Sequence, residues 1–88
     1  MTEQEVIELK ESIVDSLPYA NTDAPVTFGD EVRATLLLDE GSEVTGVMTE
    51  IQLWFNNMGS EYLIVVCVDD GDEVFYCDPD GMELVGDG

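Results

Sequence analysis

The sequence has almost no basic side chains. Its 88 residues include no His and only two cationic side chains, Lys10 and Arg33, against 21 Asp and Glu, which gives a formal net charge of −19. Proteins bind DNA, RNA and anionic membranes through basic patches that neutralise phosphates, so direct binding of this kind is excluded. General acid–base chemistry would rest on carboxylates alone, so we expect no enzyme. The expected partner is a basic protein surface.

Long hydrophobic runs are also missing. The longest uninterrupted apolar run, Leu63 to Val68, is far too short to span a bilayer, and the first residues are acidic where a secretory signal is basic. We therefore expect a cytoplasmic protein. Hydrophobic residues still make up 44% of the chain and fall in periodic runs, so the acidity is not that of a disordered tail. The length predicts a single folded domain over 1–88.

The chain has two cysteines, Cys67 and Cys77. If the segments that carry them pair across a turn at Asp70-Gly71, Cys67 lies opposite Val74 and Cys77 opposite Ile64. The two side chains then project from opposite faces of the hairpin and are offset along it, which does not suit a disulfide. We predict two free thiols in the core.

Metal and cofactor sites have little support in the sequence. Zinc ligands are lacking because there is no CxxC pair and no His. The acidic turns at 69–73 and 78–81 do not have the ligand spacing of a calcium-binding EF-hand. We expect no bound metal and no cofactor.

An amphipathic helix is predicted at 3–17. Apolar residues recur there at intervals of three to four, and the chain meets Pro18 directly afterwards. Thr2 followed by Glu5 matches a capping box at the start of the helix. On the side away from the apolar face, Glu8, Glu11 and Asp15 form one acidic row.

The sequence after the helix predicts a loop at 18–29, and beyond it apolar residues alternate with polar ones as in β-strands. The expected strands are at 31–38, 43–55, 62–69, 73–77 and 82–85, separated by turns rich in Asp, Asn and Gly. Gly46, early in the long second strand, is where a small barrel would bend. The predicted fold class is α+β, mainly β: an N-terminal helix followed by a five-stranded antiparallel meander that curls into a small barrel, with an open sheet covered by the helix on one face as the alternative.

Three stretches resemble the Tudor/KOW-type small barrels: Val44-Thr45-Gly46-Val47-Met48-Thr49-Glu50-Ile51, Tyr62 to Gly71, and Asp78 to Val85. Those folds share a glycine-bent strand, a hairpin with an Asp-Asp-Gly turn and a closing strand of this kind. The resemblance covers roughly half the chain and implies a fold, because its motifs are mostly turn chemistry.

A shorter resemblance concerns Glu11-Ser12-Ile13 followed by Leu17-Pro18. It is similar to a segment of the phage uracil-DNA glycosylase inhibitor family, whose members are small acidic mimics of DNA. In that family the segment is an extended strand, whereas here the periodicity predicts a helix. The resemblance implies only the broader class of acidic DNA-mimic inhibitors encoded by phages.

The charge suits such a class. Duplex DNA carries about one charge per 1.7 Å of axis, so 19 charges correspond to roughly 32 Å, the scale of a folded chain of this length. By strand parity Trp54 faces outward and is the aromatic side chain expected to touch a partner, while Phe55 faces the core. The predicted partner-binding residues are Glu8, Glu11, Asp15, Asp39, Glu40, Trp54, Asp69, Asp70 and Asp72.

Three hypotheses follow from the sequence. The first is a phage-encoded DNA mimic that binds and inhibits a basic nucleic-acid-binding protein in the host cytoplasm. In the second, the acidity is adaptation to high salt and says nothing specific about function. The third is a small barrel that binds a basic or methylated peptide through Trp54 and the acids around it.

Overall fold

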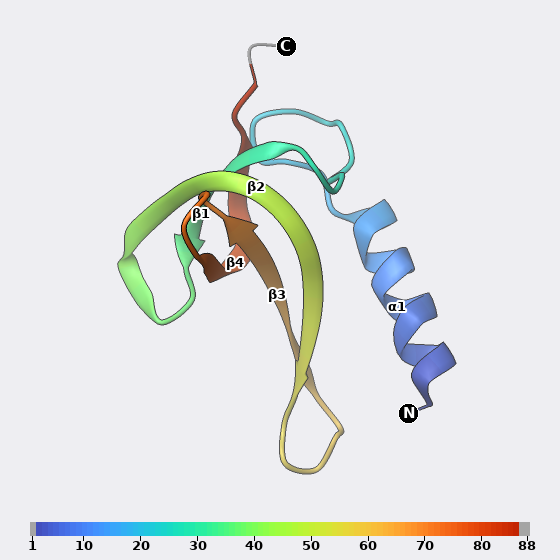
Figure 1. The fold of residues 1–88 in the computed structure, drawn as a ribbon. Coiled ribbons are helices and arrows are strands. Elements are labelled where there is room, and N and C mark those ends of the chain that lie inside the picture. The colour runs from blue at the N-terminus through green and yellow to red at the C-terminus, as the bar shows by residue number, and fades with distance from the viewer. Residues whose placement is uncertain (1, 87–88) are drawn as a thin grey trace.

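A computed structural model describes residues 2–86 and contains one helix packed beside an antiparallel sheet (Figure 1). The class is therefore α+β and mainly β, with four strands where the sequence analysis predicted five. The elements in chain order are α1 (Glu3–Ser16), β1 (Glu31–Leu36), β2 (Asp39–Phe55), β3 (Tyr62–Asp69) and β4 (Val74–Leu84).

Helix α1 begins and ends close to the predicted bounds. The Glu5 backbone N–H donates to the Thr2 hydroxyl at 3.2 Å, which satisfies one of the free donors of the first turn. The helix ends at Ser16, one residue before the predicted end. Its buried residue is Ile13, which joins the core of the sheet. The Glu11-Ser12-Ile13 segment is therefore helical, as the sequence predicted.

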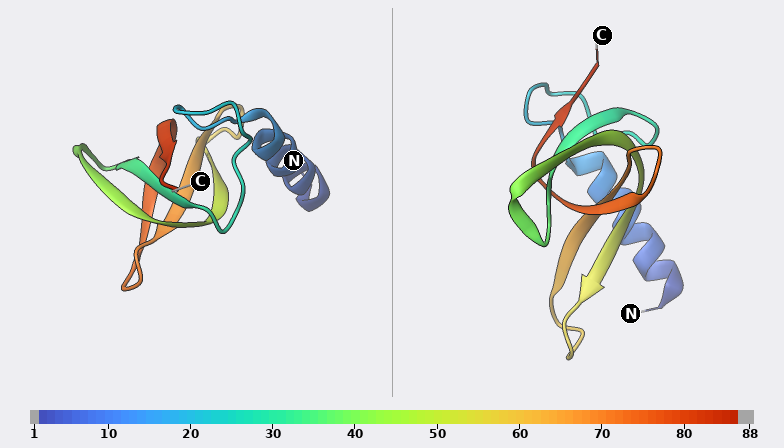
Figure 2. Two further views of the ribbon diagram at one scale, coloured as in Figure 1. Left: turned by 90° about the horizontal axis from the view of Figure 1, so that it is seen from above. Right: turned by 60° about the vertical axis from the view of Figure 1, so that its left-hand side comes forward.

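The strands pair in chain order, and β1 also pairs with β4, so the pairings form a closed ring. The long strand β2 makes this possible because it bends (Figures 1 and 2) and pairs first with β1 and then with β3. Gly46 lies at the change of partner. A Cβ there would be 2.3 Å from the carbonyl oxygen of Asp69, so only glycine permits this approach of the two backbones.

The first hairpin turns earlier than predicted. The sequence predicts a turn at 39–42, but the chain turns at Leu37-Leu38, and β2 already begins at Asp39. The Leu37 N–H is held by the carbonyl of Tyr76 on β4, at 3.0 Å. The predicted turn residues instead form an irregularity inside β2, where the pairing register with β1 shifts.

The predicted fourth and fifth strands are one bent strand, β4. The segment Asp78-Pro79-Asp80-Gly81 does not turn the chain back: Thr35 of β1 pairs with Asp78, and Arg33 pairs with Glu83. The residues between them bulge out of the ladder. Pro79 has no N–H to donate to a ladder and Gly81 adopts a positive φ of 78°, which are features of a bulge as well as of a turn.

The pairing of β3 with β4 differs from the predicted register. Cys67 lies opposite Tyr76 and Cys77 opposite Val66. The hairpin turns one residue later than predicted, because Gly71 takes a φ of 106° and the Asp70 carboxylate accepts two backbone N–H groups beyond it. Both cysteines are buried and free, which confirms the predicted thiols.

The core lies inside the ring and under the C-terminal half of α1. No helix in residues 2–86 is long and apolar enough to cross a membrane. The core residues are Ile13, Tyr19, Val26, Val32, Ala34, Met48, Ile51, Val66, Val68, Cys77 and Met82.

Candidate functional site

The carboxylates lie at the surface and are scarcely neutralised. None of the charged side chains in residues 2–86 is buried. Arg33 and Glu83 form the one ion pair of the described chain, so the other charged groups, Lys10 included, make none. The half-buried acids are Asp30, Asp69, Asp78 and Glu83; the other described acids are exposed.

The predicted contact acids occupy three separate places and form no single cluster. Glu8, Glu11 and Asp15 are exposed on α1, as predicted. Asp39 and Glu40 lie at the β1–β2 hairpin, and 69–72 lies at the β3–β4 hairpin. Seen from above, the two hairpins point away from the helix and from each other (Figure 2). Within 2–86 no three Asp, Glu or Cys side chains gather closely enough to hold a metal ion.

The β3–β4 turn organises its own carboxylates. Asp69 accepts the Gly71 N–H at 2.8 Å, and Asp70 accepts the N–H groups of Asp72 and Glu73 at 2.9 and 3.1 Å. These hydrogen bonds favour the charged form and lower the pKa of Asp70. The turn therefore holds the charged carboxylate of Asp70 by hydrogen bonds from its own backbone.

Trp54 lies on the outward face of the sheet, as strand parity predicted. It sits on β2 and its ring meets that of Tyr76 on β4, with centroids 5.4 Å apart. The two rings meet across β3, which lies between their strands, and Val65 on the same face beneath them is 0% exposed. The indole N–H donates to Gln52 at 2.8 Å, so the ring is fixed in place.

The prediction that Phe55 points into the core is wrong. The side chain is 39% exposed and packs on Tyr62, with ring centroids 6.0 Å apart. Strand parity fails because the β2–β3 hairpin extends beyond the ring of strands (Figure 1), where neither face has a core to contact. Tyr62, its partner in this contact, is also 44% exposed.

Sequence reasoning missed the apolar neighbours of Trp54. We call the exposed apolar residues of this outer face the outer strip. Leu38 and Val74 line one shallow hollow with Tyr76, and Leu63 is paired with Trp54 in the sheet. The sequence does contain a signal for these neighbours. Side chains alternate between the two faces along β4, so Tyr76 and Val74 lie on the face opposite to that of the buried Cys77. The outer strip consists of Trp54, Leu63, Val74 and Tyr76 together with Leu38 of the adjoining β1–β2 turn, all at least one third exposed.

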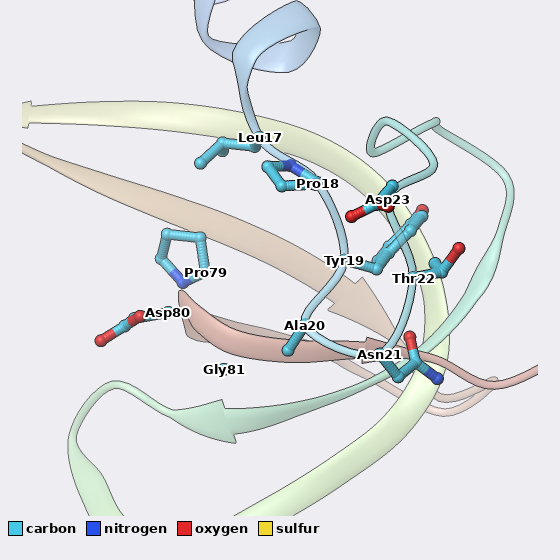
Figure 3. Close-up of a pocket in the computed structure, with 10 residues that line it drawn as sticks. All are labelled: Leu17, Pro18, Tyr19, Ala20, Asn21, Thr22, Asp23, Pro79, Asp80 and Gly81. Carbon is cyan, nitrogen blue, oxygen red and sulfur yellow. The ribbon is translucent and has the colours of Figure 1, made fainter.

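A larger hollow than the one beside Tyr76 lies elsewhere, between the chain that follows α1 and the bulge of β4 (Figure 3). Leu17 and Pro18 form one side and Pro79 and Asp80 the other. Tyr19 also lines the hollow, but its hydroxyl is bonded to Asp30, at 2.8 Å, and to the Thr27 backbone, neither of which belongs to the lining, and burial raises the pKa of Tyr19 to about 12. This hollow offers two exposed carboxylates, Asp23 and Asp80, and no activated nucleophile or base along its lining.

Comparison with protein-family models, curated proteins and solved structures found no match to this chain. The candidate site therefore rests on two features of the molecule itself, the unpaired surface carboxylates and the outer strip.

Proposed function

We propose that this protein is an acidic mimic of nucleic acid that binds and inhibits a basic nucleic-acid-binding protein. The supporting observation is the amount of unpaired negative charge on a narrow body. The molecule measures 39 × 26 × 21 Å and has a net charge of −19. Duplex DNA of the same length carries roughly 23 phosphate charges, at one per 1.7 Å. A cleft built for a duplex would meet a comparable charge over a comparable length.

The acidic row on α1 provides the most regular part of this charge. Glu8, Glu11 and Asp15 rise by roughly 4.5 and 6 Å along the helix axis. These spacings are of the same order as the spacing of phosphates along one DNA strand, which is about 3.4 Å of helix axis per phosphate. The row stands on a capped helix, so the backbone positions that carry the three carboxylates are fixed relative to one another.

We also propose that the ring of strand pairings is a small barrel of the Tudor/KOW kind. The bend of β2 at Gly46 and the pairing of β1 with β4 support this assignment. A phage origin and action in the host cytoplasm belong to the same proposal, on the basis of size and charge.

The test is capture from lysate with the immobilised chain. We expect it to retain a nucleic-acid-binding protein that added duplex DNA and rising salt both displace, since the two ligands compete for one basic surface. Glu8, Glu11 and Asp15 are then all replaced by Lys, and capture should be lost. Recovery only of proteins with no affinity for nucleic acid contradicts the proposal.

A matched variant separates the position of the charge from its amount. Replacing Asp23, Glu31 and Glu43 by Lys changes the net charge equally at exposed positions outside the predicted contacts. This variant should still capture the partner. Equal loss of capture in both triple variants would mean that only the total charge matters, which contradicts the assigned role of α1.

The alternative of adaptation to high salt makes a different prediction. A halophilic chain unfolds in dilute buffer and refolds in molar KCl, because molar salt shortens the Debye length to about 3 Å and screens its self-repulsion. A DNA mimic has to keep its fold and its long-range field in dilute buffer. A cooperative thermal transition that is present only in molar salt would favour salt adaptation over mimicry.

A further inference from the structure

One edge of the sheet is left open beside the outer strip. Strand β4 pairs with β3 only along 66–69, and then departs through its bulge toward β1. The preceding segment of β3, Tyr62–Val65, has β2 on one side and no strand of the described chain on the other. The closed ring therefore protects the edges of the strands within it but not this end of β3.

The backbone at this edge has free hydrogen-bonding groups. The Asn56 N–H donates to the Glu61 carbonyl at 3.0 Å, and this bond determines which residue pairs along the β2–β3 hairpin are hydrogen-bonded to each other. Antiparallel strands exchange hydrogen bonds at every second pair, so Leu63 and Val65 direct their backbone groups toward β2. Tyr62 and Ile64 direct theirs outward. In the part of the chain that the structure describes, neither residue makes a backbone bond on that side.

The edge also lacks the features that usually block strand addition. Natural edge strands carry a Lys, a Pro, an inward charge or a bulge. Here the four residues from Tyr62 to Val65 are all apolar or aromatic, and their pairing with β2 is regular. Tyr62 and Leu63 are 44% and 46% exposed, so a second chain can approach them.

We propose that the free edge of β3 binds an extended basic segment of the partner protein, which adds to the sheet as a further strand in line with β4. This inference rests on the proposed function for the basic character of the partner, and adds where and in what conformation the partner binds. Main-chain hydrogen bonds to Tyr62 and Ile64 hold the segment, and alternate side chains contact Leu63 and the Trp54–Tyr76 pair.

Charge determines which chain can occupy the edge. A second copy of this protein would bring a charge of −19 against −19, so self-association through the edge is opposed. Carboxylates stand at both ends of the open segment: Glu61 precedes it, and Asp78 begins the bulge where β4 leaves. Arg or Lys side chains of an added strand can pair with these acids and lie over the exposed aromatic faces.

The test uses two short synthetic peptides of equal length, one alternating Val with Arg and the other Val with Glu. Trp54 is the only tryptophan, so its fluorescence reports binding at the outer strip. We expect the Val/Arg peptide to change this emission and to slow amide hydrogen exchange at Tyr62 and Ile64. The Val/Glu peptide should do neither. Association without protection of these two amides would overturn strand addition.

A pair of variants isolates the backbone contact. Tyr62→Pro and Tyr62→Ala both remove the side chain, but only the proline removes the outward N–H. This position tolerates proline because its N–H is not part of the β2 ladder. We expect the Val/Arg peptide to bind Tyr62→Pro about five-fold more weakly than Tyr62→Ala, the effect of about 1 kcal/mol for one hydrogen bond. Circular dichroism checks that both variants fold.

Equal affinity of the two variants would refute the edge as the docking site. Edge binding can fail while the captured nucleic-acid-binding protein is still displaced by DNA, in which case the mimic stands and only its contact surface is wrong. Conversely, peptide addition at the edge in a chain that captures no such protein would leave a strand-binding module without the mimic function.

Discussion

Gly46 tests the closed pairing of the sheet most directly. Replacing it with alanine places a Cβ 2.3 Å from the Asp69 carbonyl oxygen and 2.8 Å from its carbon, where unstrained contacts need about 3.5 Å. Both neighbours are backbone, so no side chain can move aside. Overpacking of this kind costs about 3 kcal/mol at the upper end of its range, and the reduced freedom of the unfolded chain returns about 0.7 kcal/mol.

The expected net loss for Gly46→Ala is therefore about 2 kcal/mol, or a fall in Tm of roughly 8–16 °C for a domain of this size. The assay is thermal and urea unfolding at one fixed salt concentration, followed by Trp54 fluorescence. Gly41→Ala is the matched control: nothing lies within 4 Å of its Cβ and its φ is not positive, so it should be neutral or slightly stabilising. Equal stability of the two variants would refute the close approach of β2 to the β3–β4 turn.

Three further predictions follow from the titratable groups. Asp70→Ala should lower Tm at neutral pH, and the difference from the parent should disappear in acid, because a carboxyl with a lowered pKa loses its contribution as pH falls through that pKa. Tyr19→Phe should cost about 1–2 kcal/mol in urea unfolding through the lost bond to Asp30, and should make the fall in stability above about pH 10 smaller than in the parent, because Tyr19 ionises first in the unfolded chain. Cys67 and Cys77 should react with a thiol reagent at pH 8 only after urea is added, because burial raises both thiol pKa values, that of Cys77 to about 11.

The helix was predictable because its signals are local. A cap at Thr2, an apolar period of three to four and a terminating Pro18 all lie within one short segment, and the structure differs by a single residue. The number of strands was not predictable from the same kind of signal. Asp-Pro-Asp-Gly suits a turn and a bulge equally, and the choice between them is made by pairing with β1, some 45 residues earlier in the chain.

The candidate site divides in the same way. Exposure of the acids and of Trp54 follows from charge and strand parity, so the sequence predicted both. The contact of Trp54 with Tyr76 was not predictable, because it depends on the register between β3 and β4. The prediction that Phe55 is buried was wrong. Strand parity assumes that a core lies behind every part of a strand, but the end of β2 extends beyond the closed ring of strands.

Neither salt adaptation nor mimicry by itself explains both the surface carboxylates and the outer strip. Salt adaptation accounts for surplus Asp and Glu, but it gives no reason to expose Trp54, Leu63 and Tyr76 beside an unpaired strand edge. Mimicry of phosphates accounts for the charge and its length, yet a duplex has no aromatic face directed outward. The two proposals together, an acidic surface that attracts a basic partner over distance and an apolar edge that holds it at contact, account for both features. They also assign the two features different steps: rising salt should slow association through the carboxylates, whereas substitutions at Trp54 or Tyr62 should mainly speed dissociation.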